Sequence, residues 1–577
     1  MIVQRTLQAF GDATFKLGEF APPDVDNPLD LGPGEGILSP EVIPADPGAS
    51  CIVAVIDHAI PFAHHLLTHG AGHSRVAAIW MMESPVAHPR ADIPFGQDLT
   101  GVEIDYLRGL DGGPVRRGDK ALYRELGLIN PSKPSGRRFL RQDSHGAAVA
   151  CCAAGFLPDD DTGLAHPLIG VSLPDWALAK TAGALMPMLI QLSVCFILAR
   201  AQRVSEQFSR AAGRQLTLPV VVNMSLGITA GSRDGFSLVE RLQDLVAAEP
   251  PPGLGPVHFV LSSGNSRQDR VNAVLRRRDR IGWQILPDDH TPSELQIWSA
   301  PLALPQKPIR LRLTLPDGRR VVTDFARPLP GFAESFFIYD PHGYELARLT
   351  LRGHERPCDT MRQQLSVIVP PTVAPIWDVG IAPIGQWQVQ LIDGPGSECD
   401  AVIQRDDRLP GFPPGGRQSY FVDPGYRITR SNGQWPDHDP VPPDAMVRLD
   451  GTCNAFAWGE AQIRCGAALG PERENPTRSS PYSSLLRNGM NGDLVSTGDR
   501  GAALPGILTP GMYNGVMQMM GGTSVATPQA VRWIAARLAS GARLETRDEV
   551  IAAARAARPG WADPPRVDPP LPWQIRH

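Results

Sequence analysis

Four short segments of the sequence carry side chains that together could turn a hydroxyl group into a nucleophile. They hold Asp57, His145, Asn265 and Ser524, in that order along the chain. A serine hydroxyl is a poor nucleophile until an imidazole removes its proton, and a carboxylate then fixes the tautomer of that imidazole and stabilises its charged form. An asparagine amide can donate a hydrogen bond to the oxyanion that forms when the serine attacks a carbonyl group. These residue types therefore point to a site for acyl transfer, provided that the fold brings them together.

The elements around these residues are expected to place them at one edge of a parallel sheet. Apolar, β-branched runs that end in small or polar residues predict strands at 51–57, 218–227 and 257–265. Helical segments separate these strands, and this alternation predicts an α/β fold whose ligands gather at the carboxyl ends of the strands. Asp57 and Asn265 end two of the strands. His145 and Ser524 each open a helix of small residues, whose first N–H groups would face developing negative charge.

A second, all-β unit is predicted to interrupt the α/β domain. Residues 281–405 show short alternating segments with Pro, Asp or Gly at the turns, such as IRLRLTL-PDG-RRVVTDF, which predicts an inserted β-sandwich. Its tryptophans are expected to fill the core rather than to form a binding face; they are Trp283, Trp298 and Trp387. The expected parts of the chain are an extended N-terminal arm (1–50), the first part of the α/β domain (51–270), the inserted β-sandwich (281–425), the second part of the α/β domain (426–560) and a Pro-rich C-terminal tail (561–577).

Four segments of the chain resemble the signature segments of the subtilisin-like serine peptidases, or subtilases. They are AVIDHAIPF, QDSHGAAVA, SSGNS and GGTSVATPQAV. The order Asp, His, Ser along the chain is also that of subtilisin, the reference case for this arrangement. The resemblance covers residues 50–265 and about 445–545, and it implies a subtilisin-like parallel sheet that is flanked by helices.

The resemblance also implies a role for each residue of the site. Ser524 would be the nucleophile, His145 the general base and acid, and Asp57 the residue that orients His145. Asn265 and the backbone N–H of Ser524 would form the oxyanion hole. The substrate would lie between two walls, which consist of Ser225, Leu226 and Gly227 on one side and Ser262, Ser263 and Gly264 on the other.

The sequence departs from the family pattern next to two of these residues. His58 and Ala59 follow Asp57 where the family has Thr or Ser and then Gly, so the turn and the hydrogen bonds around the carboxylate are in question. The family's Thr-His after the catalytic histidine and glycine is replaced by Ala147 and Ala148. None of these changes removes a triad group, and we therefore expect a competent site.

A serine endopeptidase is the function that these residues favour. It would hydrolyse peptide bonds of a protein or peptide substrate, and this chemistry requires no cofactor. Two other classes stay open, namely a catalytically silent protein that uses the fold for binding or scaffolding, and an esterase or transacylase that uses the same triad. The chain has no G-x-S-x-G segment, which argues against an α/β-hydrolase.

Composition and charge favour a cytoplasmic protein that binds neither nucleic acid nor membrane. The 577 residues carry a formal net charge of −5, and no aromatic residues alternate with the basic run 276–280, which is therefore expected to be a solvated loop. The apolar stretch 184–199 is short for a membrane span and contains a proline, so a buried helix is expected. The N-terminus does not have the pattern of a secretory signal.

Five histidines crowd residues 58–73, and those at 65, 69 and 73 have the spacing of one helical face. Gly70 and Gly72 would break such a helix, so packing is favoured over zinc binding and no metal site is predicted. Subtilases often bind structural calcium, but the ligands are scattered and map to no segment of this chain. We expect the β insert to shape access to the cleft or to dock a regulatory protein.

Overall fold

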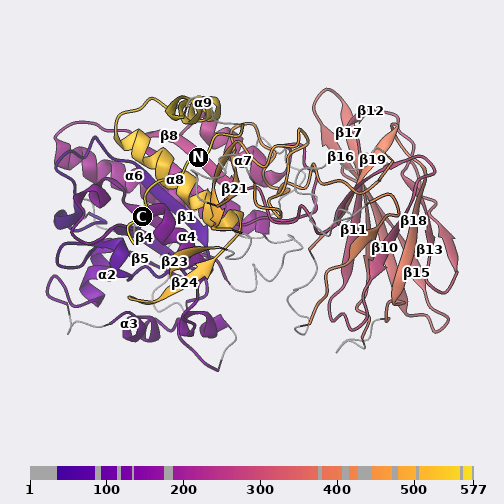
Figure 1. Ribbon diagram of the computed structural model, residues 1–577, viewed down its shortest axis with the longest axis horizontal. Helices are drawn as coiled ribbons and strands as arrows, with labels where there is room; N and C mark the ends of the chain where they lie inside the picture. The colour runs from indigo at the N-terminus through magenta and orange to yellow at the C-terminus, as the bar shows by residue number, and fades with distance from the viewer. Residues whose placement is uncertain are drawn as a thin grey trace.

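The computed structural model describes residues 36–84, 93–113, 118–132, 135–174, 186–373, 380–405, 415–426, 444–470, 479–501, 506–558 and 563–574. They form two lobes, one with helices around a central sheet and one built of strands (Figure 1). The α/β class with a largely parallel sheet, which the sequence predicts, is confirmed.

An eight-stranded sheet lies at the centre of the first lobe. Its strands are β1 (Ile52–Asp57), β4 (Val76–Met81), β5 (Gln97–Thr100), β6 (Leu168–Ser172), β7 (Leu218–Met224), β8 (Leu254–Ser262), β21 (Ile463–Leu469) and β22 (Leu494–Asp499). They lie in the order β22-β21-β8-β7-β1-β6-β4-β5, and every neighbouring pair is parallel except β4 and β5. The neighbours β8, β7 and β1 are the strands predicted next to the polar residues, and their carboxyl ends meet at one edge of the sheet.

Helices cover both faces of this sheet. They are α2 (Gly101–Leu107), α3 (Asp119–Glu125), α4 (His145–Ala154), α6 (Met186–Ala212), α7 (Leu238–Ala248), α8 (Thr523–Ala539) and α9 (Arg547–Ala557). Successive side chains of a strand point to opposite faces. Accordingly Ile52, Ala54 and Ile56 of β1 pack in one core with α6 and α7, whereas Val53 and Val55 pack in the other with α4 and α8.

Short elements complete the lobe. They are the 3-10 turns η1 (Pro40–Val42), η2 (His65–Leu67), η3 (Ser135–Leu140) and η4 (Asp161–Ala165), and the two-stranded ribbons β2 (Thr68–His69) with β3 (His73–Ser74) and β23 (Ile507–Pro510) with β24 (Met517–Met520).

Helix α6 contains most of the apolar stretch for which the sequence predicts a buried helix. Among the described residues it is the one helix that is long and apolar enough to cross a membrane by length and composition. In this structure 61% of its apolar window is buried inside the protein. Leu189, Ile190 and Ile197 pack in the same core as β1, so the helix is an integral part of the α/β lobe.

The second lobe is a sandwich of two antiparallel sheets. One sheet has the order β14-β13-β18-β10-β20, and the other has the order β15-β16-β17-β11-β19-β9 with β12 paired to β17. The strands are β9 (Asn272–Arg276), β10 (Arg280–Ile285), β11 (Ser293–Ser299), β12 (Leu302–Ala303), β13 (Arg310–Thr314), β14 (Arg320–Val322), β15 (Ala333–Tyr339), β16 (Glu345–Arg356), β17 (Thr360–Val369), β18 (Gly385–Asp393), β19 (Glu398–Ile403) and β20 (Tyr420–Val422). Trp283 and Trp387 face each other in the register of β10 and β18 and are fully buried in the sandwich core, as expected. Trp298 is 5% exposed but lies outside that core, where Arg362 and His354 lie against its ring, so the expectation is wrong for this residue.

The ends of the predicted parts differ from the observed elements in three places. The first sandwich strand begins at Asn272, before the expected start of the insert at 281. The described part of the expected N-terminal arm is packed into the α/β core, where Ile37 and Leu38 are each 2% exposed. The C-terminal tail lies along the sheet edge, because Val567 donates a backbone hydrogen bond to Val495 of β22. All eight cysteines are free thiols.

Ion pairs join the sandwich to the segment that follows β7. Arg356 and Arg362 of the sandwich lie 2.8 Å and 3.2 Å from Asp234. Arg362 and Arg487 both contact Asp400, at 3.0 Å and 2.8 Å. Because Arg356 and Arg362 are less than a tenth exposed, their ion pairs with Asp234 are largely shielded from solvent, and they tie the insert to the segment that follows β7.

Candidate functional site

Three neighbouring strands bring polar residues to the same level of the sheet edge. Asp57 is the last residue of β1, Ser225 directly follows β7, and Ser262 is the last residue of β8. The register pairs Ile56 with Met224 and Met224 with Leu261, which are the residues just before these three. The parallel strand order thus places the three residues side by side, as the sequence analysis expected.

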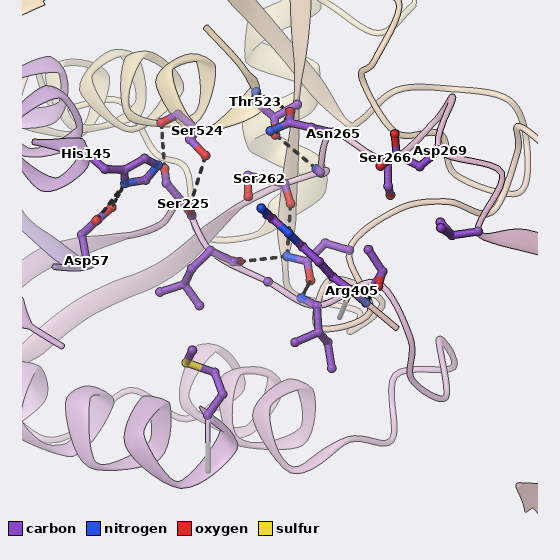
Figure 2. A pocket seen from close by; sticks show the side chains of 18 of the residues that line it. Asp57, His145, Ser225, Ser262, Asn265, Ser266, Asp269, Arg405, Thr523 and Ser524 are labelled. Atoms are coloured by element: carbon purple, nitrogen blue, oxygen red, sulfur yellow. Dashed lines mark hydrogen bonds and ion pairs between the residues drawn. The ribbon is translucent and has the colours of Figure 1, made fainter. Parts of the chain in front are cut away.

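Helix α4 begins at His145 and is fixed against the end of β1 by its N-cap. Ser144 Oγ accepts a hydrogen bond from the N–H of Ala147 at 3.1 Å and donates one to the carbonyl of Ala59 at 2.8 Å. His145 Nδ1 lies 2.8 Å and 2.9 Å from the two carboxylate oxygens of Asp57 (Figure 2). The Asp57 side chain is 1% exposed and that of His145 is 25% exposed, so the carboxylate is sealed from water while the ring reaches the cleft.

Asp57 and His145 shift each other's pKa. Burial alone would raise the pKa of Asp57, but the charge of His145 and the hydrogen bonds from His145 and His58 outweigh it and hold that pKa well below its usual range. Burial alone would lower the pKa of His145, yet the Asp57 carboxylate raises it above its usual value. The lowered pKa of Asp57 and the raised pKa of His145 mean that the pair stabilises the fold most between the unfolded carboxyl pKa and the unfolded histidine pKa. This contribution is lost as the pH falls through the folded pKa of Asp57 or rises through the folded pKa of His145.

The residues that depart from the family pattern keep this carboxylate hydrogen-bonded. The backbone N–H of His58 donates to Asp57 Oδ1 at 2.8 Å, and His58 Nδ1 lies 3.1 Å from the same oxygen. Ala59 stands where the family has glycine, and it adopts the left-handed conformation that glycine favours, with φ 46°. The turn therefore forms without the glycine, and a histidine replaces the hydroxyl residue at the carboxylate.

Glycine is the one residue type that fits at position 146, where α4 meets the end of β1. A Cβ added at this position would lie 2.0 Å from the carbonyl oxygen of His58. We expect Gly146→Ala to push the start of α4 away from β1, to lengthen the Asp57–His145 contact and to lower kcat about 100-fold, because catalytic groups displaced by about 1 Å lose that much. Gly118→Ala is the matched control, since its added Cβ at the N-cap of α3 meets nothing within 4 Å. Equal kinetic losses in the two variants would contradict this prediction.

Ser524 lies in the first turn of α8, after Gly522 with φ 112°. Its Oγ donates a hydrogen bond to the carbonyl of Ser225 at 3.3 Å, and the Ser225 hydroxyl donates to the Ser524 carbonyl at 3.0 Å. No hydrogen bond joins Ser524 to His145 within the described part of the chain. For a proton transfer the Ser524 hydroxyl has to leave the Ser225 carbonyl and turn to the ring, and such contacts often tighten only when substrate binds.

Asn265 lines the cleft, and its amide oxygen is held by Thr523. Oδ1 accepts hydrogen bonds from the backbone N–H and the hydroxyl of Thr523, both at 3.0 Å. Because a backbone N–H can only donate, the amide oxygen must be the atom that points at Thr523. The NH2 group is then the end of the amide that can donate a hydrogen bond to an oxyanion. Figure 2 shows Asn265 and Thr523 beside Ser524 at the cleft.

A cleft of about 530 Å³ connects these groups. Five of the six predicted substrate-contacting residues line it, namely Ser225, Leu226, Gly227, Ser262 and Gly264. Ser263 does not belong to this lining. It is fully buried, and its backbone N–H donates to the carbonyl of Cys465 on the neighbouring strand, so the alternation along the strand turns its side chain away from the cleft.

Asn454 forms the floor between the two walls, and the sequence analysis missed it. Its Nδ2 donates to the carbonyls of Leu226 and Ser262, one on each wall, at 3.0 Å and 3.2 Å. Its Oδ1 accepts from the N–H groups of Ile228 and Phe456 at 3.2 Å and 3.1 Å. A polar residue between buried neighbours, in TCNAFAW, was the available signal, but nothing local indicates that it bridges walls about 190 and 230 residues away.

Removing the Asn454 side chain should loosen both walls. Asn454→Ala leaves two buried carbonyls and two N–H groups without partners, and we expect it to lower the free energy of unfolding by about 2–4 kcal/mol. We also expect kcat/KM to fall about tenfold, mainly through KM, since the residue touches the walls and not the reacting atoms. Asn488→Ala is a control, because that exposed side chain also accepts a backbone N–H, from Met490. A variant with unchanged KM would show that the floor does not shape binding.

The sandwich contributes to the same cleft. Arg405 and Gln418 line it, and both belong to the insert. Thr229, in the segment after β7, donates through Oγ1 to the carbonyl of Ile403 at 3.1 Å, and Gln404 Oε1 accepts from the Thr229 N–H at 3.2 Å. The insert therefore forms part of the wall, which supports the expectation that it shapes access to the cleft.

A second, smaller cavity of about 360 Å³ also borders His145. It shares His58 and His145 with the larger cleft and is otherwise lined by Arg138, Asp143, Met519 and their neighbours.

Two groups of described residues have ligand atoms close enough to hold a metal ion by distance. They are Asp57, His58 and His145, and His73, Asp105 and Asp111. In both groups the members already contact one another through hydrogen bonds or ion pairs, such as His73 Nδ1 with Asp105 at 3.2 Å and with Asp111 at 3.8 Å. The trio His65, His69 and His73, which the sequence analysis weighed, is not among these groups.

Among known proteins, a solved structure matches the fold of this chain, whereas the sequence comparisons find no match. No protein-family model and no curated protein sequence matches the chain. A solved structure, that of the CspB protease of Clostridium perfringens, matches with a TM-score of 0.56 and 16% sequence identity, over 90% of this chain and 92% of that one. The unmatched tenth of the chain is shorter than the insert, so most of the sandwich lies within the match. The chain thus shares its fold with the CspB protease of Clostridium perfringens.

Proposed function

We propose that the protein is a subtilisin-like serine endopeptidase. The observation that carries the proposal is the Asp57–His145 pair, whose ring opens into the cleft that also holds Ser524 and Asn265. Two cavities border His145, and this favours an endopeptidase, which needs room for the chain before and after the scissile bond. The fold shared with a protease is consistent with this activity.

In the proposed reaction Ser524 attacks the scissile carbonyl while His145 takes its proton through Nε2. Asp57 holds the proton on Nδ1 and stabilises the imidazolium that forms. The Asn265 NH2 group and the Ser524 backbone N–H donate to the oxyanion of the tetrahedral intermediate. His145 then protonates the leaving amine, and a water molecule that His145 activates hydrolyses the acyl-enzyme.

The first test is labelling with a fluorophosphonate probe, which reacts with activated serines. We expect the wild-type protein to be labelled and Ser524→Ala to remain unlabelled, with both proteins folded. Cleavage of a denatured protein substrate by wild type only would then establish a peptidase. Hydrolysis of small esters without peptide cleavage would favour an esterase or transacylase, and absence of labelling in folded wild type would favour a silent binding protein.

The substrate, the cofactor requirement, the location of the protein and the role of the insert are also part of the proposal. The substrate is a protein or peptide, and the chemistry requires no cofactor. We place the protein in the cytoplasm, away from membranes and nucleic acid, with the insert as the docking place of a regulator. Gln404→Ala tests the link between insert and cleft, because it removes the acceptor of the Thr229 N–H. A change in KM or in cleavage-site preference would support that link.

A further inference from the structure

Arg405 brings a positive charge from the insert into the cleft. It follows strand β19 of the sandwich, and it lines the same cleft as Ser524 and Asn265. The residue is exposed, and in Figure 2 its side chain points toward the side of the cleft that holds Ser225 and Ser262. A substrate that lies between the two walls would therefore meet the charge of this side chain.

Hydrogen bonds to Thr229 hold the backbone of Arg405 at the cleft wall. The N–H of Arg405 donates to Thr229 Oγ1 at 2.7 Å, and the Thr229 hydroxyl donates to the carbonyl of Ile403 at 3.1 Å. The buried Gln404 side chain accepts from the N–H groups of Thr229 and Ala230, at 3.2 Å and 3.3 Å. Three consecutive residues of the insert are thus bound to the segment after β7, and the Arg405 side chain starts from a fixed place on that wall.

Two acidic residues also line this cleft. Asp57 is 1% exposed and hydrogen-bonded to His145, so its charge acts within that pair. Asp269 is exposed, and Figure 2 shows it beside Ser266, away from the part of the cleft toward which Arg405 points. Among the described residues that line the cleft, Arg405 is the one lysine or arginine. The charge next to the walls is therefore positive within the described lining.

A guanidinium group is well suited to recognise a carboxylate. It presents several N–H donors in one plane, and a pair of them can bond both oxygens of an aspartate or glutamate side chain. A guanidinium that already has one partner keeps donors for a second carboxylate. A lysine or arginine of the substrate would meet a like charge at the same place, so this side chain would both favour acidic substrates and disfavour basic ones.

We propose that Arg405 is a specificity-determining residue, which makes the cleft prefer peptides with an acidic side chain close to the scissile bond. The inference rests on the proposed peptidase function for its effect on turnover. The preference in binding does not require that Ser524 reacts, so it can be measured separately.

The kinetic test uses internally quenched peptides that share one cleavage site of the wild-type protein and carry either Glu or Lys at one position close to it. We expect the wild type to cleave the best Glu peptide with a kcat/KM about tenfold above that of the matched Lys peptide, because an exposed charge pair contributes modestly. Arg405→Gln should cleave the two peptides alike, and Arg405→Glu should prefer the Lys peptide. The wild-type preference should also shrink in about 0.5 M NaCl, since salt screens exposed charges.

Arg417→Glu is the matched control. Arg417 is also an exposed arginine of the insert, next to Gln418, but it is not among the residues that line the cleft. Its substitution changes the net charge as much as Arg405→Glu does and should keep the preference for the Glu peptide. Equal cleavage of the two peptides by the wild type would overturn the proposal. A preference that persists in Arg405→Glu, or that Arg417→Glu also removes, would overturn it as well.

A binding measurement separates this inference from the peptidase function. Fluorescence anisotropy in the Ser524→Ala background compares two short labelled peptides that differ only in a central pair of Glu or Lys residues. We expect a Kd about tenfold lower for the Glu peptide, and the reverse order once Arg405→Glu is added. Equal Kd values in a protein whose wild type cleaves peptides would reject the inference and retain the peptidase. An acidic preference in a protein whose wild type neither labels nor cleaves would retain the inference and reject the peptidase.

Discussion

Asp57→Asn should lower kcat for peptide hydrolysis by about four orders of magnitude and leave KM nearly unchanged. The backbone N–H of His58 donates to Oδ1 and would therefore hold the amide oxygen of the introduced side chain at that position. The amide NH2 group would then occupy the Oδ2 position, 2.9 Å from His145 Nδ1, and would donate to that nitrogen. His145 Nδ1 would then face one amide donor and one amide oxygen, so the Nδ1–H tautomer would no longer be enforced, and the imidazolium that forms when His145 takes the Ser524 proton would lose its counter-charge.

The chain offers a matched control for this substitution. Asp105 is also fully buried and also contacts a histidine, His73, at 3.2 Å, but it lies on α2, away from the cleft. We expect Asp105→Asn to lower the melting temperature and to keep kcat within about twofold of wild type. A similar loss of kcat in both variants would mean that general destabilisation, and not the tautomer of His145, explains the effect at Asp57.

Asn265→Ala should lower kcat by about 100- to 1000-fold, which corresponds to about 2.7–4 kcal/mol of transition-state stabilisation. The side chain is exposed, and its hydrogen bonds within the described part of the chain are with Thr523, so the fold and KM should change little. Asn265→Asp is the more specific test of the NH2 donor. It keeps an acceptor for the Thr523 N–H but replaces the NH2 donor by an anion, so kcat should fall at least as far as in Asn265→Ala.

The control is Asn514→Ala, because this exposed asparagine also accepts a backbone N–H, that of His65 at 2.8 Å. Steady-state kinetics on one peptide substrate compare the three variants, and thermal unfolding checks the folded state. Turnover of Asn265→Asp close to that of wild type would remove Asn265 from the oxyanion hole, since no donor would remain on that side chain.

Local signals were enough to predict the elements that carry the candidate site. The runs at 51–57, 218–227 and 257–265 are rich in β-branched and apolar residues, as expected for strands covered on both faces, and they form β1, β7 and β8. Ser144 before His145 is a good N-cap residue, and α4 begins there. The parallel sheet followed from the alternation of strands and helices, whereas the pairing of Asp57 with His145 was implied by the resemblance to the subtilases.

Features that depend on distant contacts could not be predicted. Asn454 bridges two strand ends far away in sequence, and its neighbours in the chain give no sign of this. The stacking of His58 on His145 depends on a turn in which Ala59 adopts a conformation that glycine normally supplies. The insertion of Arg405 into the cleft wall depends on how the sandwich sits against the segment after β7.

The sandwich separates the two chain segments that form the first lobe, and this affects the order in which the lobe is synthesised. Strands β21 and β22 and helix α8 follow the whole sandwich, although they complete the sheet that β1, β7 and β8 begin. Ser524 leaves the ribosome long after His145, by about 20–75 s at the usual 5–20 residues per second. Throughout that interval the nascent chain holds a base without a nucleophile. Under the proposed peptidase function, a ribosome-bound chain that still lacks Ser524 cannot cleave itself or its neighbours.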